Sequence, residues 1–203
     1  MHPNWLLRAN ARYQLGGSIL SNCWLMLIVV YLIFSTIFTA AISTFIIGLL
    51  IYGPFMYGFA LITISLVRGK GRVELEDLFK GFSEYLTDNI LLGLLTYLFI
   101  FLWSLLFVIP GIVKTYSYAM VYYIKLDEPA LSAKECIDKS RAMMDGYKMK
   151  LFLLDLSFIG WYLVGTMACG FGVLFVFPYH ITARANFYES LKAGYASFGE
   201  ATA

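Results

Sequence analysis

The chain carries the stretch Leu105-Leu106-Phe107-Val108-Ile109-Pro110-Gly111-Ile112-Val113-Lys114-Thr115-Tyr116-Ser117-Tyr118, in which a proline and a single cation interrupt an apolar run. A proline has no N–H and frees a carbonyl one turn earlier, and an ammonium in hydrocarbon costs roughly 2.5 to 3.5 kcal/mol. Both features need compensation elsewhere in the chain. The Leu-Phe-Val-Ile-Pro motif that ends at Pro110 returns as Leu-Phe-Val-Phe-Pro at Pro178, and a looser form ends at Pro54. The three prolines predict a hairpin unit that recurs three times.

The composition around this stretch is that of a membrane protein. The 203 residues are 60% hydrophobic and 14% charged, with a mean hydropathy of +0.74, whereas soluble domains are about 25% charged. The formal net charge is only +2, which does not indicate a nucleic-acid partner. Cys23, Cys136 and Cys169 are far apart in the sequence, so we expect free thiols rather than disulfides or a zinc site.

The apolar runs predict an all-α fold, a polytopic transmembrane helix bundle of about six spans in three hairpins. We expect a single transmembrane domain over residues 1–192 and a flexible tail over 193–203. The first apolar run is too long for a cleavable signal peptide and is expected to be retained. The predicted spans are about 19–42, 45–67, 89–107, 110–126, 151–168 and 173–188.

Two amphipathic helices are expected between the spans, on the cytoplasmic side. The first lies within residues 73–88, where apolar residues recur at helical spacing among acids. The second begins at Ser132, because Ser132 and Glu135 have the spacing of a capping box, and Gly146 is placed to end it.

The basic residues indicate the direction of threading. With both termini in the cytoplasm, all but one of the 15 Lys and Arg lie on the inner side, as the positive-inside rule requires. The exception is Lys114. The predicted outer turns near Ser43, Pro110 and Gly170 carry no charge, which argues against a large external binding domain.

Several motifs resemble those of a known family. They are Pro110-Gly111-Ile112, Asp127-Glu128-Pro129, the capped helix from Ser132, Leu154-Asp155-Leu156-Ser157-Phe158-Ile159-Gly160-Trp161, and Pro178-Tyr179 with Phe187-Tyr188-Glu189. Together they resemble the bacterial integral membrane family called domain of unknown function 975, over most of the chain. The Ile-Pro-Gly turn and capped helix are also distantly similar to the membrane domain of some glycerophosphodiester phosphodiesterases. The resemblance implies a bacterial cytoplasmic membrane protein and supplies no catalytic residue, ligand or cofactor.

Charged residues inside the predicted spans are the candidate site. Asp155 and Arg184 fall on neighbouring antiparallel spans, where a direct ion pair is easy, and Lys114 could reach toward them. One interpretation is an ion pair that fixes helix register while Lys114 snorkels to the interface. A second is a polar pocket for an anionic or amphiphilic solute, lined by Lys114, Asp155 and Arg184 with Tyr118 and His180. A third is that Lys114 caps free carbonyls.

Pro110 also has two interpretations. It either begins the fourth span after a tight turn, where its missing N–H is harmless, or it bends a helix inside the membrane and opens space above Lys114. We favour the bend, because Pro54 and Pro178 repeat the motif.

The sequence shows no nucleophile elbow, zinc-binding His-Glu-x-x-His or phosphate loop, so we expect no enzyme, no metal and no cofactor. Two functions compete. One is binding, or helping to transport, a small anionic or amphiphilic solute or lipid. The other is a membrane scaffold that binds a peptide, a lipid or a partner membrane protein. For either function we expect the chain to lie in the lipid bilayer. The sequence leaves open whether it forms a homo-oligomer.

Overall fold

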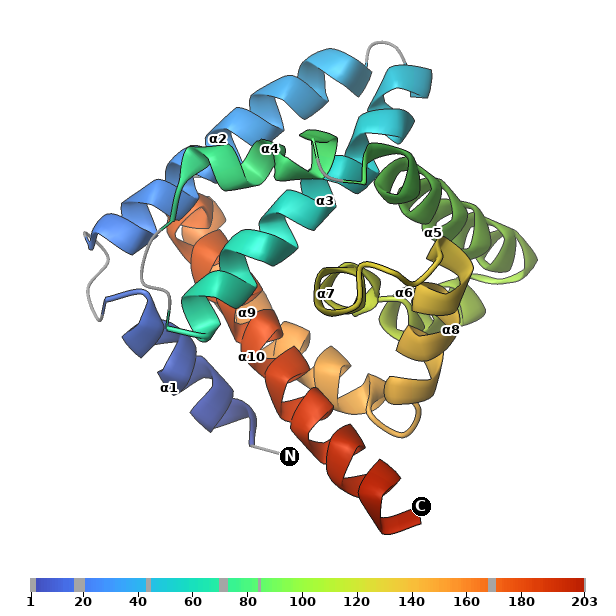
Figure 1. Cartoon of the computed structure of the whole chain (residues 1–203). Helices are drawn as coiled ribbons and strands as arrows, with labels where there is room; N and C mark the ends of the chain where they lie inside the picture. Colours follow the sequence, from blue (N-terminus) through green and yellow to red (C-terminus); the bar gives the residue numbers. More distant parts are fainter. Residues whose placement is uncertain are drawn as a thin grey trace. The chain divides into compact units, whose positions relative to one another are not determined.

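The computed structural model describes residues 3–16, 21–42, 45–69, 73–83, 85–167 and 171–202, and all of its regular structure is helical. Side chains are described over 3–16, 21–37, 48–69, 73–83, 85–167 and 172–195. The helices are α1 (Asn4–Gln14), α2 (Asn22–Ile42), α3 (Phe45–Val67), α4 (Leu75–Ser83), α5 (Leu86–Leu106), α6 (Val108–Ser117), α7 (Val121–Asp127), α8 (Ala133–Met143), α9 (Lys148–Met167) and α10 (Phe171–Thr202) (Figure 1). The predicted all-α class is confirmed.

Within the described residues, three helices are long and apolar enough to cross a membrane: Gly48–Val67 of α3, Leu86–Leu106 of α5 and Lys148–Met167 of α9. The apolar part of α2 that is described, Asn22–Ile37, is shorter than a full span. Six spans were predicted, and the described residues support three of them. The start of the first predicted span at residue 19, the turns at Ser43 and Gly170, and Cys169 lie outside the described residues.

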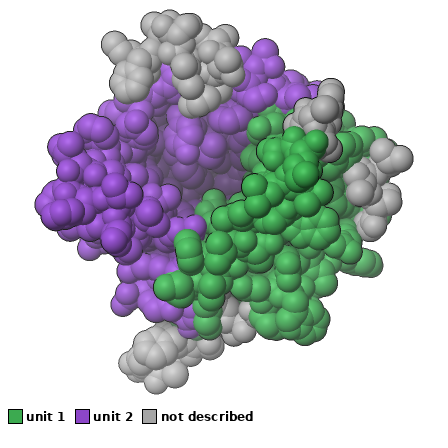
Figure 2. Space-filling view, turned by 180° about the vertical axis from the view of Figure 1, so that it is seen from behind, with its two compact units in different colours: residues 1–31, 63–73, 149–203 green, residues 32–62, 74–148 purple. Residues whose placement is uncertain are grey.

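The chain divides into two compact units, coloured separately in Figure 2. Unit 1 contains residues 1–31, 63–73 and 149–203, and unit 2 contains residues 32–62 and 74–148. Unit 1 therefore holds α1, α9 apart from its first residue, and α10, and unit 2 holds α4 to α8. The predicted single domain over 1–192 stays a prediction.

The predicted fourth span over 110–126 is wrong as one helix. The chain forms α6 and α7 there, of 10 and 7 residues, and breaks between them at Tyr118–Met120. Ser140 of α8 stabilises the break, because its hydroxyl donates to the Ser117 carbonyl (2.8 Å) and accepts from the Met120 N–H (3.3 Å). These are backbone groups that a continuous helix would pair internally.

The preferred interpretation of Pro110 is also wrong. α5 ends at Leu106, Phe107 is extended with φ −160° and ψ 147°, and α6 begins at Val108. Pro110 therefore lies in the first turn of α6, where backbone N–H groups have no helical acceptor, and its missing N–H costs nothing. Pro54 and Pro178, in contrast, lie inside α3 and α10. The shared motif does not produce a shared geometry.

The capping box at the start of α8 is confirmed. The Ser132 hydroxyl accepts from the Glu135 N–H, and the Glu135 carboxylate accepts from the Ser132 N–H at 2.8 Å. A hydrogen bond from the Ser132 hydroxyl to the carboxylate, followed by the bond from the Ser132 N–H, holds the pKa of the Glu135 carboxyl below its usual value. Gly146 follows the helix with φ +73°, as expected for a residue that ends one. Neither Cys136, on the buried face of α8, nor Cys23 forms a disulfide with a described residue, and burial raises the pKa of the Cys136 thiol to about 11.

At the other end of the chain, α10 continues as a helix to Thr202. It thus runs through most of the segment 193–203, for which we predicted a flexible tail.

Lys125 of α7 is the most deeply buried charge among the described side chains, with 0% of its side chain exposed. Its ammonium donates to Asp88 Oδ2 (2.8 Å), to the Pro129 carbonyl (2.9 Å) and to the Leu131 carbonyl (2.8 Å). All three N–H groups are therefore satisfied. The ammonium joins the start of α5 to the loop that precedes α8.

We expect Lys125→Met to lower the free energy of unfolding by about 2 kcal/mol, because it removes three hydrogen bonds from a charged donor and leaves two carbonyls to find water. Lys139→Met is the matched control, since Lys139 pairs with Glu128 where both side chains are partly exposed, and such a pair contributes about 0 to 1 kcal/mol. Reversible unfolding in a non-ionic detergent measures both. Equal losses for the two variants would contradict the structural role of Lys125.

Candidate functional site

Asp155 of α9 and Arg184 of α10 form the predicted ion pair. Arg184 donates through Nε to Asp155 Oδ1 (3.1 Å) and through Nη2 to Asp155 Oδ2 (2.8 Å). This fork of two parallel hydrogen bonds is the strongest arrangement available to a guanidinium and a carboxylate. The Asp155 side chain is 17% exposed, so the pair is partly withdrawn from solvent and matched in charge.

His180 extends this pair into a polar cluster, defined here as Asp155, Tyr162, His180 and Arg184. The Nε2 atom of His180 lies 2.8 Å from Asp155 Oδ1, and Nδ1 lies 3.1 Å from the Tyr162 hydroxyl. The imidazole also stacks on Phe158, with ring centroids 4.6 Å apart. Both nitrogen atoms of the His180 ring therefore have a partner, which is typical of a partly buried histidine that joins two helices.

Lys114 and Tyr118, the other two predicted site residues, belong to unit 2, whereas all four residues of the polar cluster belong to unit 1. The Lys114 ammonium lies over the Trp103 ring, 4.4 Å from its centroid, which is a cation–π contact. Tyr118 is buried beside Phe99. Lys114 also lines a cleft of about 390 Å³ between α6 and α8. Two of its other cations, Arg141 and Lys148, pair with Asp138 and Asp145 of the same cleft.

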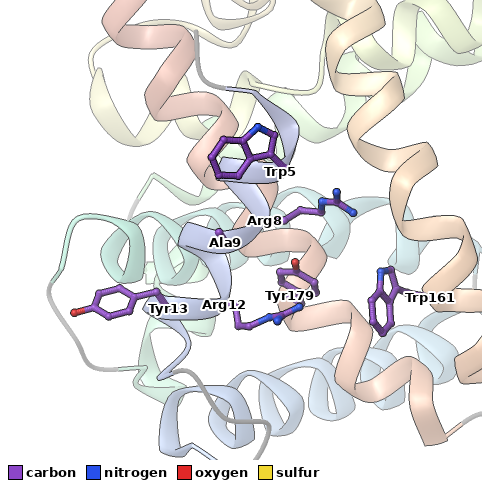
Figure 3. Close-up of a pocket in the computed structure, with 7 residues that line it drawn as sticks. All are labelled: Trp5, Arg8, Ala9, Arg12, Tyr13, Trp161 and Tyr179. Atoms are coloured by element: carbon purple, nitrogen blue, oxygen red, sulfur yellow. The ribbon is translucent and has the colours of Figure 1, made fainter.

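A larger cleft, of about 500 Å³, lies in unit 1 and is called the N-terminal cleft here. α1 contributes five of its seven lining residues. Trp161 comes from α9 and Tyr179 from α10 (Figure 3). The full lining is Trp5, Arg8, Ala9, Arg12, Tyr13, Trp161 and Tyr179.

The α1 residues form one stripe because they recur at steps of three and four along the helix. The opposite stripe, Leu7, Ala11 and Leu15, is buried. Gln14, at the end of α1, anchors the helix through hydrogen bonds with Asn186 of α10 and the Val67 carbonyl of α3. The cleft stripe is therefore held in a defined orientation.

Arg8 and Arg12 give the N-terminal cleft its charge. They lie one helical turn apart on α1, and neither pairs with a carboxylate among the described residues. Arg12 places its guanidinium carbon 5.7 Å from the centroid of the Tyr179 ring. Like charges at this spacing destabilise a helix by about 0.2 to 0.5 kcal/mol. An anion between the two guanidiniums would remove that repulsion and accept their hydrogen bonds.

The N-terminal cleft was not predicted from the sequence, because α1 lies before the first predicted span at residue 19. The sequence does carry the pattern of an amphipathic helix here. Leu7, Ala11 and Leu15, which are buried, recur along one side, and Trp5, Arg8 and Arg12 recur along the other. This pattern is weak beside the long apolar spans, which dominate the hydropathy of the chain. Among the described residues no cluster of three His, Cys, Asp or Glu is arranged to hold a metal ion.

The helices and their composition define the class first: this is an all-helical protein with apolar helices of membrane-spanning length. The chain belongs to the family described as Protein of unknown function (DUF975), whose model matches residues 1–115 and 105–194. No curated protein and no solved structure is significantly similar to it. The family assignment from the sequence motifs is thus confirmed, whereas the distant similarity to glycerophosphodiester phosphodiesterases is not shown.

Proposed function

We propose that this chain is a non-enzymatic protein of the bacterial cytoplasmic membrane that binds, or helps to transport, a small anionic or amphiphilic ligand. The N-terminal cleft is the binding site in this proposal. The observation that supports it is the pair Arg8 and Arg12, one turn apart on a cleft wall without a described carboxylate partner. Elsewhere in unit 1, Arg184 and Arg68 are matched by Asp155 and Glu189.

The walls of the cleft favour a ligand that is partly apolar. Trp5, Tyr13, Trp161 and Tyr179 are aromatic, and Trp161 belongs to α9, a helix that fits a membrane span. Small-molecule sites typically combine an aromatic lining with a few placed polar groups. An amphiphile could keep its chain in the bilayer while its head contacts the arginines.

The polar cluster has a positioning role in this proposal. Tyr162 follows Trp161 on α9, and His180 follows Tyr179 on α10, so the hydrogen bond from Tyr162 to His180 joins the two helices beside the cleft. The bonds of Asp155 to His180 and Arg184 join them again. Asp155, His180 and Arg184 would therefore keep Trp161 and Tyr179 in place, instead of contacting the ligand as one of the interpretations of the sequence had it.

We expect Arg8→Gln/Arg12→Gln to weaken binding of an anionic amphiphile at least about tenfold, the equivalent of one lost charge-assisted hydrogen bond. A brominated dodecanoate is a suitable probe, because it should quench the fluorescence of Trp5 and Trp161. The control Lys134→Gln/Arg141→Gln removes the same charge from α8, outside the cleft, and should bind as the wild type does. Equal weakening in both double variants, or no saturable quenching in the wild type, would contradict this function.

The second candidate function is the membrane scaffold. One observation favours it over transport: α6 begins cleanly at Val108, so Pro110 opens no space inside a helix. A transporter uses broken helices to expose backbone groups to its solute, whereas Ser140 pairs backbone groups at the Tyr118–Met120 break. A scaffold predicts saturable binding of a partner protein that the arginine double variant retains.

The threading of the chain is proposed from the charge pattern. Both termini lie in the cytoplasm, and α2, α10 and the broken α6–α7 segment complete the crossings made by α3, α5 and α9. In this arrangement α8 is cytoplasmic. A membrane-impermeant thiol reagent applied to intact cells should not label a cysteine placed at Lys139 in an otherwise cysteine-free chain. Labelling there would overturn the orientation.

A further inference from the structure

The charge of the N-terminal cleft points to a particular class of anion, an inference that rests on the proposed function. Arg8 and Arg12 place two formal positive charges within one helical turn. Because guanidinium groups do not lose their protons in proteins, both charges persist at every physiological pH. No described carboxylate offsets either of them.

A monoanion balances only one of these charges. A fatty-acid carboxylate or a phosphodiester carries a single negative charge, whereas a phosphomonoester carries about −1.5 to −2 at neutral pH and three strongly accepting oxygens. Two guanidiniums can each form a bidentate contact with such a group. In the polar cluster, one negative charge balances one positive charge, because Asp155 accepts two hydrogen bonds from Arg184.

The surroundings of the arginines decide whether the phosphate is free or carried by a lipid. On α9, Val164 lies one turn beyond Trp161 on the same face. The two side chains are 65% and 50% exposed, within a helix that is long and apolar enough to cross a membrane. This apolar face continues from the cleft in a direction that an acyl chain could follow. Because α9 is proposed to cross the bilayer, a lipid could keep its acyl chain along this face, whereas a free phosphate would make no contact with it.

We propose that the N-terminal cleft selects a lipid phosphomonoester, with the phosphate between Arg8 and Arg12 and an acyl chain along Trp161 and Val164. The arginines supply the selectivity for charge and the α9 face supplies the selectivity for a chain. The α6–α8 cleft does not share this pattern, because two of its three cations already pair with its own aspartates.

The experiment compares two lipids with identical chains in nanodiscs of otherwise zwitterionic lipid. Phosphatidic acid is the phosphomonoester and phosphatidylglycerol the phosphodiester, and native mass spectrometry of the full-length protein counts the copies of each that are bound. We expect the phosphomonoester to bind about tenfold more tightly at about pH 7.5. The preference should shrink at about pH 5, because the second ionisation of a phosphomonoester has a pKa near 6. Phosphatidylglycerol does not titrate in this range, so it reports any titration of the protein itself.

The variants separate this inference from the proposed function. Arg8→Gln and Arg12→Gln should each abolish the preference for the phosphomonoester, and Val164→Ser should weaken both lipids equally. If both lipids bind equally in the wild type and both depend on the arginines, the phosphomonoester inference is overturned while the anion-binding function stands. If neither lipid depends on the arginines, both fail. If inorganic phosphate displaces phosphatidic acid at comparable concentrations, the ligand is free phosphate and the lipid inference is overturned.

Discussion

Asp155→Ala should be among the most destabilising single substitutions in this protein, lowering the free energy of unfolding by about 3 to 5 kcal/mol. The carboxylate accepts two hydrogen bonds from Arg184 and one further contact from His180. Its removal takes away the carboxylate that balances the partly buried guanidinium, and it takes away the partner of the imidazole Nε2. Most of the cost is the desolvation of that uncompensated charge rather than the loss of the pair itself.

The double variant Asp155→Ala/Arg184→Ala tests this account. Removing both partners removes both charges of the pair, so the double variant should be more stable than Asp155→Ala alone. Reversible unfolding of the purified protein in a non-ionic detergent measures the three variants of the cycle. Equal losses for the single and double variants would show that the pair is not coupled. Asp155→Asn is a useful companion, because it keeps the shape and one acceptor while removing the charge.

Gly93→Ala should destabilise the protein by about 3 kcal/mol, and Gly93→Leu should prevent folding. Gly93 of α5 faces Gly53 of α3, and a Cβ atom added at Gly93 would lie 2.7 Å from the Gly53 Cα and 3.0 Å from its backbone nitrogen. Backbone atoms cannot rotate away as a side chain can, so α3 and α5 would have to separate. Overpacking of this kind costs about 1 to 3 kcal/mol, occasionally more. Small residues at such crossings are how membrane helices approach closely.

Gly160→Ala is the matched control in another long apolar helix. A Cβ atom at Gly160 of α9 meets nothing within 4 Å. Because alanine is better than glycine inside a helix by up to about 1 kcal/mol, this variant should be unchanged or slightly more stable. Thermal unfolding of Gly93→Ala and Gly160→Ala under the same detergent conditions compares them directly. Unfolding at similar temperatures would show that the α3–α5 crossing is looser than the structure indicates.

The sequence determined the class, the family and the local signals of this protein. Apolar runs predict helices because hydrocarbon forces backbone groups to pair within the segment, and α3, α5 and α9 confirm that reasoning. The capping box at Ser132 was predictable because both of its hydrogen bonds connect residues three positions apart. The ion pair of Asp155 and Arg184 was predictable because two charges in neighbouring apolar helices have few other partners.

Tertiary structure decided the features that depend on residues far apart in the chain. The predicted fourth span breaks at Tyr118–Met120 because Ser140, 20 residues beyond Met120, forms hydrogen bonds with backbone groups that the break leaves unpaired. Lys125 is a buried anchor because the Pro129 and Leu131 carbonyls and Asp88 converge on it. The N-terminal cleft exists because Trp161 and Tyr179 meet a helix more than a hundred residues earlier. Spacing along the chain encodes partners within a helical turn, whereas these contacts arise from helix packing, which periodicity alone does not specify.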